Sequence, residues 1–415
     1  MHNQALGTLT MQSLNLEPSR SALKTLACPN FNAIRSYACS LFDTLLSSLK
    51  CSCDTHAVKL RLESRNEKTA DENDLLANTY FRVIFTHSLS LTLPSVSPWK
   101  EADIRWITDK TIRLPPSPQV TPHKIGKAAR QVHFDKPQTQ ASSSTITITK
   151  TSMDTSSSNL EITDLCKAIE GLHLGQSQAN ACAGYLVDKL QRKQGIYPCE
   201  PPAPPNNQEQ WTAYTLRQVL SKQAGVGRQL ARADTYKIAL HLASSVLQLY
   251  QTPWLSNDWS DVDVYFVLRP GTSLASVYQH PFIYRDLSTV AGQGSPPQQP
   301  ANKIIRSQTL FSLGVVLIEL LYRRSIEELQ TPEDLQCGGT PGVIWCTADR
   351  LIATEQIELE GGNDYANAVR RSIRCDFDFA NWKLEDRDFQ KAVYSGVVAP
   401  LEVAHRHFTG QFAIA

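Results

Sequence analysis

The sequence predicts an α+β protein, with strands concentrated in its N-terminal half and helices in its C-terminal half. Residues 57–63 alternate apolar and charged side chains, which is typical of a half-buried strand. Residues 80–85 are mostly β-branched or aromatic and predict a second strand. Residues 310–321 are almost entirely apolar, which indicates a helix buried inside a larger domain. A chain of 415 residues is long enough for two or three domains.

The N-terminal half combines further helices and strands with polar connections. Apolar residues recur every three or four positions from Phe31 to Leu49 and again from Leu160 to Leu174, so both stretches predict amphipathic helices. Residues 182–197 predict two strands around a polar turn. The polar stretch from Glu67 to Asp74 predicts a loop, and residues 1–34 predict a poorly ordered N-terminus.

Low-complexity segments interrupt this half of the chain. Residues 94–122 carry a Pro-Pro-Ser-Pro run, and residues 138–159 are dominated by serine and threonine. Because such segments bury few large apolar groups, they cannot offset their ordering entropy, and we expect two disordered linkers. Five prolines in residues 198–207 predict a rigid spacer. This spacer separates an N-terminal part, residues 35–205, from a C-terminal part, residues 206–412.

The C-terminal part predicts mainly helices. Its expected elements are a short helix, a longer helix, a strand, a long loop, the buried helix and two amphipathic helices. In order, they cover Leu216–Leu220, Asp234–Tyr250, residues 264–268, residues 288–303, residues 310–321, Asp364–Cys375 and Leu384–Val398. Asp234 is the expected N-cap of the longer helix, because a carboxylate can accept a hydrogen bond from a free backbone N–H there. Gly314, inside the buried helix, predicts a close-packed neighbour.

Charge and hydropathy exclude several classes of protein. The chain carries 41 Lys and Arg residues against 40 Asp and Glu residues, so its net charge of +1 gives no electrostatic reason to expect a nucleic acid or an anionic membrane as partner. The longest apolar run, residues 310–321, is shorter than the about 20 residues that a membrane span needs. Residues 1–26 contain no apolar signal-peptide core. We therefore expect a cytoplasmic protein whose ten cysteines stay reduced.

Cys51, Cys53 and His56 form a motif with metal-ligand spacing. Two thiolates and one imidazole in a Cys-x-Cys-x-x-His arrangement could occupy three corners of a tetrahedral zinc site. A structural zinc site needs a fourth ligand, and no second Cys/His pair at ligand spacing occurs nearby in the sequence. The alternative is a turn with half-buried thiols ahead of the strand at residues 57–63. For want of the fourth ligand, we expect no bound metal.

Other short motifs lack residues that nucleotide binding needs. Residues 225–227 (Gly-Val-Gly) are followed by Leu230, where a dinucleotide-binding loop would have its third glycine. Residues 338–342 lack the Gly-Lys-Ser/Thr of a P-loop. Residues 284–287 (Tyr-Arg-Asp-Leu) are similar to the His-Arg-Asp-Leu of a kinase catalytic loop, but Ala291 stands where that loop has a metal-binding Asn. We treat this last match as chance.

Longer strings of residues carry a resemblance to a known family. Residues 238–255 (IALHLASSVLQLYQTPWL) and 310–321 (LFSLGVVLIELL) are similar to signatures of a large fungal family of unknown function. That family has a divergent protein-kinase-like domain, often found behind a prion-inhibition or HeLo-type helical region. Weaker matches lie at residues 51–60, 162–166, 182–186 and 394–401. The resemblance covers residues 35–410, with the low-complexity linkers as gaps.

The resemblance implies a bilobal, degenerate protein-kinase-like fold of the α+β class. A small strand-containing N-lobe would span residues 35–205, and a helical C-lobe would span residues 206–412. Asp258 and Asp263 then occupy the positions of the catalytic-loop aspartate and of the asparagine that holds magnesium. Thr309 replaces the aspartate with which the buried helix of a kinase usually opens.

The resemblance also implies that most kinase chemistry is lost. Ser260 replaces the catalytic-loop lysine, and we find no Asp-Phe-Gly segment, no glycine-rich loop and no Val-Ala-Ile-Lys strand. Because these groups act together on the phosphates, losing several of them leaves essentially no phosphoryl transfer. The sequence therefore predicts a non-catalytic, pseudokinase-like interaction or scaffold module that needs no cofactor and binds partner proteins.

Fungal self/non-self recognition or cell-death signalling is the context that the family implies. Two alternatives stay open: a nucleotide-binding regulatory switch, and an atypical protein kinase that uses Asp258 and Asp263.

Overall fold

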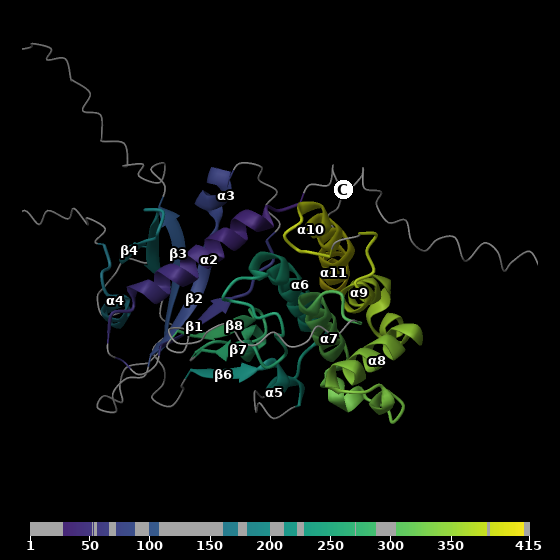
Figure 1. The fold of residues 1–415 in the computed structure, drawn as a ribbon. Coiled ribbons are helices and arrows are strands. Elements are labelled where there is room, and N and C mark those ends of the chain that lie inside the picture. Colours follow the sequence, from purple (N-terminus) through teal and green to yellow (C-terminus); the bar gives the residue numbers. More distant parts are fainter. Residues whose placement is uncertain are drawn as a thin grey trace, which may run out of the picture.

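The computed structural model describes much of the chain between residues 28 and 410 (Figure 1). The described residues are 28–51, 53, 56–65, 72–87, 99–107, 161–172, 181–199, 211–221, 228–269, 271–287, 304–379 and 382–410. The linker expected at residues 138–159, most of the expected proline spacer and the loop expected at residues 288–303 lie outside the described residues.

A single antiparallel sheet of eight strands forms one half of the molecule (Figure 1). The strands are β1 (His56–Arg61), β2 (Tyr80–His87), β3 (Trp99–Ile107), β4 (Gly184–Val187), β5 (Lys193–Pro198), β6 (Thr212–Thr215), β7 (Val264–Leu268) and β8 (Phe282–Asp286). Their order across the sheet is β4-β5-β3-β2-β1-β8-β7-β6. β1 lies inside the sheet, because Ala57 pairs with Thr86 of β2 on one side and with Asp286 of β8 on the other.

Helices flank the sheet and form the other half of the molecule. They are α2 (Phe31–Ser48), α3 (Glu72–Asn78), α4 (Leu165–Gly171), α5 (Leu216–Leu220), α6 (Arg232–Leu249), α7 (Gln308–Tyr322), α8 (Thr340–Ala353), α9 (Gln356–Arg374), α10 (Arg387–Val393) and α11 (Ala399–Thr409). Figure 1 shows α2 lying across the sheet, α6 and α7 beside it, and α8 to α11 on the side away from β4.

Alternation along the central strands gives the sheet an apolar face and a polar face. On β1, Val58 and Leu60 are buried in the main hydrophobic core, and Lys59 lies on the opposite face. α2 packs against the apolar face, where the ring of Tyr37 lies 5.2 Å from the ring of Trp106 in β3, measured between centroids. The polar face therefore lies away from α2.

The expected buried helix is α7, and the structure confirms its burial. Nearly all of its residues are buried, and it packs closely against α9. A Cβ atom added to Gly314 would lie only 2.6 Å from Cδ1 of Ile373 in α9. The hydroxyl of Tyr365 in α9 donates a hydrogen bond of 2.7 Å to the carbonyl of Leu317. The close-packed neighbour predicted for Gly314 is therefore α9.

Glu319 is buried within α7, where it is 2% exposed. Its carboxyl group accepts a hydrogen bond of 2.9 Å from the backbone N–H of Ile326, just beyond the end of the helix. Burial raises the pKa of Glu319 to about 8, and the nearby carboxylate of Asp261 adds to this effect. The side chain is therefore largely protonated at neutral pH.

Several expected elements are confirmed. α5 and β7 cover the residues predicted for them, and β4 and β5 are the two strands predicted within residues 182–197. The prediction that Asp234 is the N-cap of the long helix is wrong, because α6 begins two residues earlier, at Arg232. Asp234 instead lies in the first turn and accepts a hydrogen bond of 2.9 Å from the N–H of Ala231, the N-cap residue.

Two predictions for the N-terminal half are wrong. Residues 94–122 were expected to be a disordered linker, but β3 occupies residues 99–107. In β3 the apolar residues Ala102, Ile104 and Trp106 alternate with polar ones, a pattern that the flanking prolines obscure. A loop was expected from Glu67 to Asp74, but α3 begins at Glu72. This helix is too short for its periodicity to be recognised in the sequence.

The sheet spans the expected boundary between residues 205 and 206. β6, β7 and β8 come from the part that was expected to be helical, and they join the sheet through the pairing of β8 with β1. Farther along the chain, α8 was not predicted. α9 is interrupted at Gly362, whose φ of 76° is not helical, so the part of α9 after this residue matches the helix expected from Asp364. The apolar residues of β6 and β8 are too few to stand out in the sequence.

Cys337 and Cys346 are joined by a disulfide, although every cysteine was expected to be reduced. Gly338, with a φ of 99°, turns the chain directly before α8, so that Cys337 meets the second turn of the helix that carries Cys346. The other eight cysteines are free thiols. The turn therefore brings the two sulfur atoms within bonding distance.

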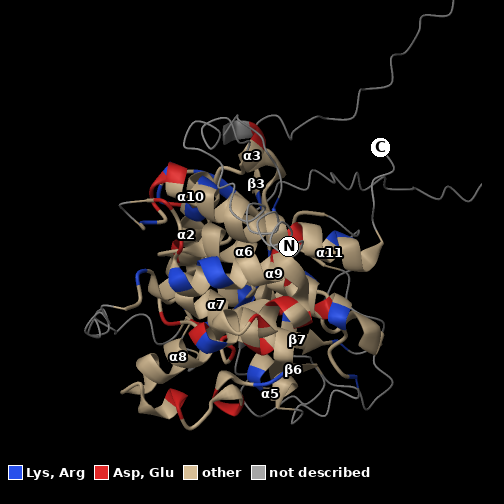
Figure 2. Cartoon of the chain, turned by 90° about the vertical axis from the view of Figure 1, so that its right-hand side faces the viewer, with Lys and Arg blue, Asp and Glu red and all other residues tan. Residues whose placement is uncertain are grey.

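Acidic and basic residues are mixed on the face shown in Figure 2, in agreement with the nearly balanced composition. In the part of the chain that the structure describes, no helix is long and apolar enough to cross a membrane.

Candidate functional site

The loop between α6 and β7, residues 250–263, carries the two carboxylates that the sequence singled out. Trp254 anchors this loop, because its fully buried indole N–H donates a hydrogen bond of 2.7 Å to the carbonyl of Ala38 in α2. Its ring also meets the ring of Phe42 edge-on, with 5.1 Å between centroids. The hydroxyl of Thr252 accepts a hydrogen bond from the Trp254 backbone N–H. The Thr-Pro-Trp-Leu string thus fixes the loop against α2.

Asp258 and Asp263 both lie near the guanidinium of Arg285 in β8. Asp258 is exposed, whereas Asp263 accepts a hydrogen bond of 2.9 Å from the N–H of Ser260. Nη1 of Arg285 lies 3.9 Å from Oδ1 of Asp263, and Arg285 donates a hydrogen bond to the carbonyl of Pro253. Burial lowers the pKa of Arg285, and the charges of Asp263 and Asp258 oppose this effect. A cation fixed by the protein therefore already balances part of the charge of Asp263.

Two further contacts hold the loop in place. The hydroxyl of Thr309, in the first turn of α7, lies 3.4 Å from Oδ1 of Asn257. Asp261 is fully buried and forms a bidentate pair with Arg217 of α5, with N···O distances of 2.9 to 3.0 Å. Burial raises the pKa of Asp261, although the pairing with Arg217 opposes this. Thr309 thus links helix and loop at the position where the resemblance implies an aspartate.

Lys59 lies in the middle of β1, on the polar face of the sheet, among aromatic rings. Its Nζ atom is 4.0 Å from the ring centroid of Trp99, 5.2 Å from that of Tyr284 and 5.9 Å from that of Tyr265. Such rings attract a cation through their negative faces. Burial lowers the pKa of Lys59 to about 8, and the side chain is well shielded from solvent. The strand therefore presents its lysine to aromatic rings.

Four arginines line a depression of about 450 Å³ on the same face of the sheet. We call this feature the arginine depression; its charged lining residues are Arg61, Arg82, Arg105 and Arg269 together with Glu101 and Asp103. Arg82 pairs with Asp103 through contacts of 2.6 and 3.0 Å, and Arg269 pairs with Glu101 through contacts of 2.7 and 2.8 Å. Both arginines are thereby held in fixed orientations.

The arginine depression carries a surplus of positive charge, because its four guanidinium groups are met by three carboxylates: Glu101 and Asp103 in its lining, and Glu63, which forms an ion pair with Arg61. His280 also lines it, and its buried Nδ1 atom has no hydrogen-bond partner among the described residues. Burial lowers the pKa of His280 to about 3, and the charges of Arg61 and other cations add to the effect. The local electrostatic potential is therefore positive and would favour an anionic group.

A second cluster unites the expected metal-ligand candidates with a fourth residue, Cys166. Cys51 follows α2, His56 opens β1, and Cys166 is the second residue of α4. Nε2 of His56 lies 3.2 Å from Sγ of Cys51 and 3.3 Å from Sγ of Cys166, while Sγ of Cys53 lies 3.7 Å from Sγ of Cys166. All four atoms lie within 4.8 Å of one another. The Cys/His cluster thus contains the fourth ligand whose lack was the reason to expect no metal.

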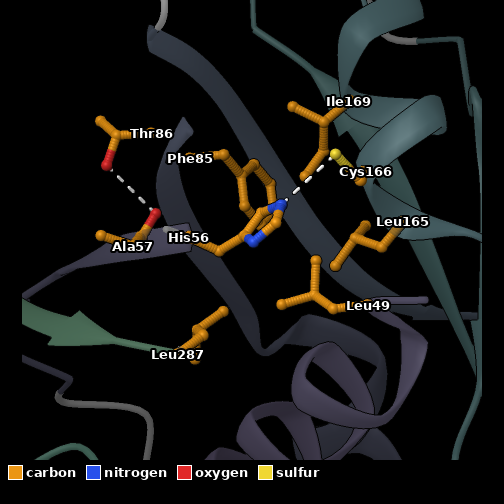
Figure 3. A pocket seen from close by; sticks show the side chains of 9 residues that line it. All are labelled: Leu49, His56, Ala57, Phe85, Thr86, Leu165, Cys166, Ile169 and Leu287. Carbon is orange, nitrogen blue, oxygen red and sulfur yellow. Dashed lines mark hydrogen bonds between the residues drawn. The ribbon is translucent and has the colours of Figure 1, made fainter. Parts of the chain in front are cut away.

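The buried half of the Cys/His cluster lies in an apolar pocket (Figure 3). Figure 3 shows the side chains of His56 and Cys166 directed toward each other. The apolar residues around them are Leu49, Phe85, Leu165, Ile169 and Leu287. His56 and Cys166 are buried, Cys51 is half-buried and Cys53 is exposed. His56 and Cys166 therefore belong to the lining of the pocket, whereas Cys51 and Cys53 do not.

The protein environment favours uncharged side chains in the Cys/His cluster. Burial raises the pKa of the Cys53 and Cys166 thiols, and the neighbouring thiols raise that of Cys166 further. Burial lowers the pKa of His56, although the charges of Asp164 and Asp286 oppose this. These groups are therefore uncharged at neutral pH.

Sequence reasoning located Asp258, Asp263 and three members of the Cys/His cluster, and it missed Arg285, Lys59 and Cys166. Lys59 was taken only as the charged side of an alternating strand. Cys166 lies 110 residues after His56, so that no local spacing could connect the two. The one available signal was the pair of strings at residues 51–60 and 162–166, both of which resemble the same family.

A family model described as a domain of unknown function, DUF7580, matches residues 30–408. The chain belongs to the DUF7580 family. The DUF7580 match includes the loop at residues 250–263, the arginine depression and all four members of the Cys/His cluster. No curated protein matches the chain.

Proposed function

We propose that this DUF7580 protein is a non-catalytic, pseudokinase-like interaction module. The observation that carries the proposal is the position of Arg285 beside Asp263. Phosphoryl transfer in kinases needs carboxylates that hold magnesium against the phosphates. A guanidinium beside such a carboxylate reduces the attraction of the carboxylate for a metal ion, because the guanidinium and the metal ion repel each other.

The surroundings of Lys59 support the same proposal. In a kinase, a lysine on a strand of the small lobe pairs with the nucleotide phosphates. Lys59 follows Ala57-Val58 on β1, but its ammonium group lies among the rings of Trp99 and two tyrosines, and the residue is only 5% exposed. A phosphate could reach it only if these rings moved.

We expect the purified protein to transfer no phosphate from ATP to itself or to generic protein substrates. Labelled ATP with magnesium or manganese should give no more incorporation than the matched variant Asp258→Asn, because the groups that stabilise the transferred phosphoryl act only together. Incorporation by the unaltered protein that is lost in both Asp258→Asn and Asp263→Ala would establish the atypical-kinase alternative instead.

A thermal-shift measurement with ATP, with and without magnesium, distinguishes the proposal from the alternative of a nucleotide-binding regulatory switch. A nucleotide at 100 times its dissociation constant would stabilise the protein by about 2.7 kcal/mol. We expect no such stabilisation.

The arginine depression is the surface that we propose for a partner. Its surplus of positive charge complements an acidic segment of another protein, to which Arg82 and Arg269 can offer the N–H groups that Asp103 and Glu101 do not occupy. The proposed setting, fungal self/non-self recognition or cell-death signalling, rests on the resemblance of residues 238–255 and 310–321 to a fungal family.

Reversing one charge of the depression should weaken binding of an acidic peptide. Arg105 suits this test because its side chain is 44% exposed, so that Arg105→Glu leaves the core untouched. We expect the affinity for a fluorescent glutamate-rich peptide, measured by anisotropy at low salt, to fall about tenfold. The control Arg324→Glu, an exposed residue beyond α7, makes the same charge change elsewhere. Equal affinities of the two variants would argue against this surface.

A further inference from the structure

We propose that Cys51, Cys53, His56 and Cys166 bind one zinc ion in a closed, structural site. The proposal goes beyond the interaction function, since it concerns a different part of the molecule. It begins from the convergence of three thiols and one imidazole from three separate segments: the chain between α2 and β1, the first residue of β1, and α4.

The distances within the Cys/His cluster fit a tetrahedron around a zinc ion. Zn–S bonds of about 2.3 Å and Zn–N bonds of about 2.0–2.1 Å give S···S edges of about 3.8 Å and S···N edges of about 3.5 Å. The Cys53–Cys166 edge measures 3.7 Å, and the two edges to Nε2 of His56 measure 3.2 and 3.3 Å. The cluster therefore has the size that one zinc ion requires.

The chemistry of the four ligands selects the metal. Three sulfur ligands and one imidazole nitrogen are soft to borderline donors, which favour zinc over the hard cations magnesium and calcium. Zinc binding would ionise the thiols and release their protons. Four protein ligands fill a tetrahedral coordination sphere and leave no position for water or substrate, so the site is structural and not catalytic.

The protein holds two of the ligands in place through its own backbone. The carbonyl of His56 accepts a hydrogen bond of 2.8 Å from the N–H of Leu287, next to β8, and the sheet fixes the rest of β1. The N–H of Cys166 donates a hydrogen bond of 3.1 Å to the carboxylate of Asp164, the N-cap of α4. Half of the site is therefore preformed, which lowers the entropic cost of binding a metal.

A zinc ion here would fasten α4 to the sheet. α4 has only seven residues and buries few apolar side chains, chiefly Leu165, Cys166 and Ile169. A helix of this length is marginal without tertiary support. Metal ligation through Cys166 would join it to His56, 110 residues earlier in the chain, and would close a loop that is otherwise costly in entropy.

The metal content of the full-length protein, purified without chelators, tests the proposal. Inductively coupled plasma mass spectrometry should find about one zinc per chain. Cys53→Ser and Cys166→Ser should each lose most of it. The exposed position of Cys53 makes its variant the safer one for folding. Cys39→Ser, a half-buried thiol in α2 outside the cluster, is the matched control and should keep its zinc.

Cobalt exchange gives a second readout that does not depend on any variant. Co²⁺ in place of zinc should produce the visible bands of a tetrahedral site and a thiolate-to-cobalt band in the near ultraviolet, and zinc should displace the cobalt, so that both bands disappear.

Removing the metal with a chelator should lower the melting temperature of the wild type and leave that of Cys53→Ser unchanged.

Three results would overturn the proposal. The first is a wild-type protein that holds no zinc and takes up no cobalt. The second is a disulfide between Cys53 and Cys166, found by mass spectrometry of the unreduced protein. The third is zinc that survives in both Cys53→Ser and Cys166→Ser, because the metal would then be bound elsewhere.

Discussion

Replacing Gly314 by glutamate should abolish the yield of soluble protein. A Cβ atom at this position would lie 2.6 Å from Cδ1 and 3.1 Å from the backbone nitrogen of Ile373, so even alanine requires Ile373 of α9 to shift. Overpacking of this kind costs about 1–3 kcal/mol, and a buried unpaired carboxylate adds several more. Together these terms approach the total stability of a typical domain, about 5–15 kcal/mol.

Two further variants separate the steric effect from the effect of charge. Gly314→Ala should fold with a melting temperature lowered by the steric term alone. Gly339→Glu, at the N-cap of α8, places the same side chain where nothing lies within 4 Å, and it should behave like the wild type. A soluble Gly314→Glu protein with an unchanged melting temperature would show that α7 does not pack against α9 as described.

Replacing Glu319 by glutamine should stabilise the protein, by an amount that grows with pH. The folded-state pKa of about 8 lies above the ordinary value of 4.5, so the folded protein binds more protons than the unfolded chain between these pH values. Wild-type stability therefore falls as pH rises through this range, and above pH 8 the full cost of burying the charge is present. Each unit of pKa shift corresponds to about 1.4 kcal/mol, so the gain reaches several kcal/mol.

Glutamine suits this test because its side-chain carbonyl can still accept the hydrogen bond from Ile326. Chemical denaturation of both proteins at pH 5, 7 and 9 should give nearly equal stabilities at pH 5 and a widening gap above it. Glu328→Gln, which changes an exposed residue of the following turn, is the control and should show no such trend. A constant gap at all three pH values would mean that Glu319 is not the group that titrates.

Local sequence patterns were sufficient to predict the elements that consist of a continuous run of apolar residues. Residues 264–268 are a run of β-branched and aromatic side chains, and they form β7. Residues 310–321 are apolar on every face of a helix, and they form the centre of α7. In both cases burial requires a continuous run of apolar residues, which can be recognised in the sequence without knowing which elements pack against it.

Elements whose stability comes from distant partners were not predictable. β3 lies between β2 and β5, and hydrogen bonds to both strands outweigh the proline-rich composition around residues 99–107. The sequence singled out Asp263, but Arg285, which lies beside it, comes from β8, 22 residues later in the chain. Cys166 joins the Cys/His cluster only because α4 folds back onto the start of the sheet.

Because β1 lies inside the sheet and pairs with β8, the sheet can be completed only after the ribosome has made β8. Ala57 pairs with Asp286, which is 229 residues further along the chain. At about 5–20 residues per second, the ribosome needs roughly 10–45 s to make that stretch. Until then β1 has no neighbour on one side, and an unpaired strand edge is a site where nascent chains associate. The interior strand of the finished protein is therefore an edge strand of the nascent one.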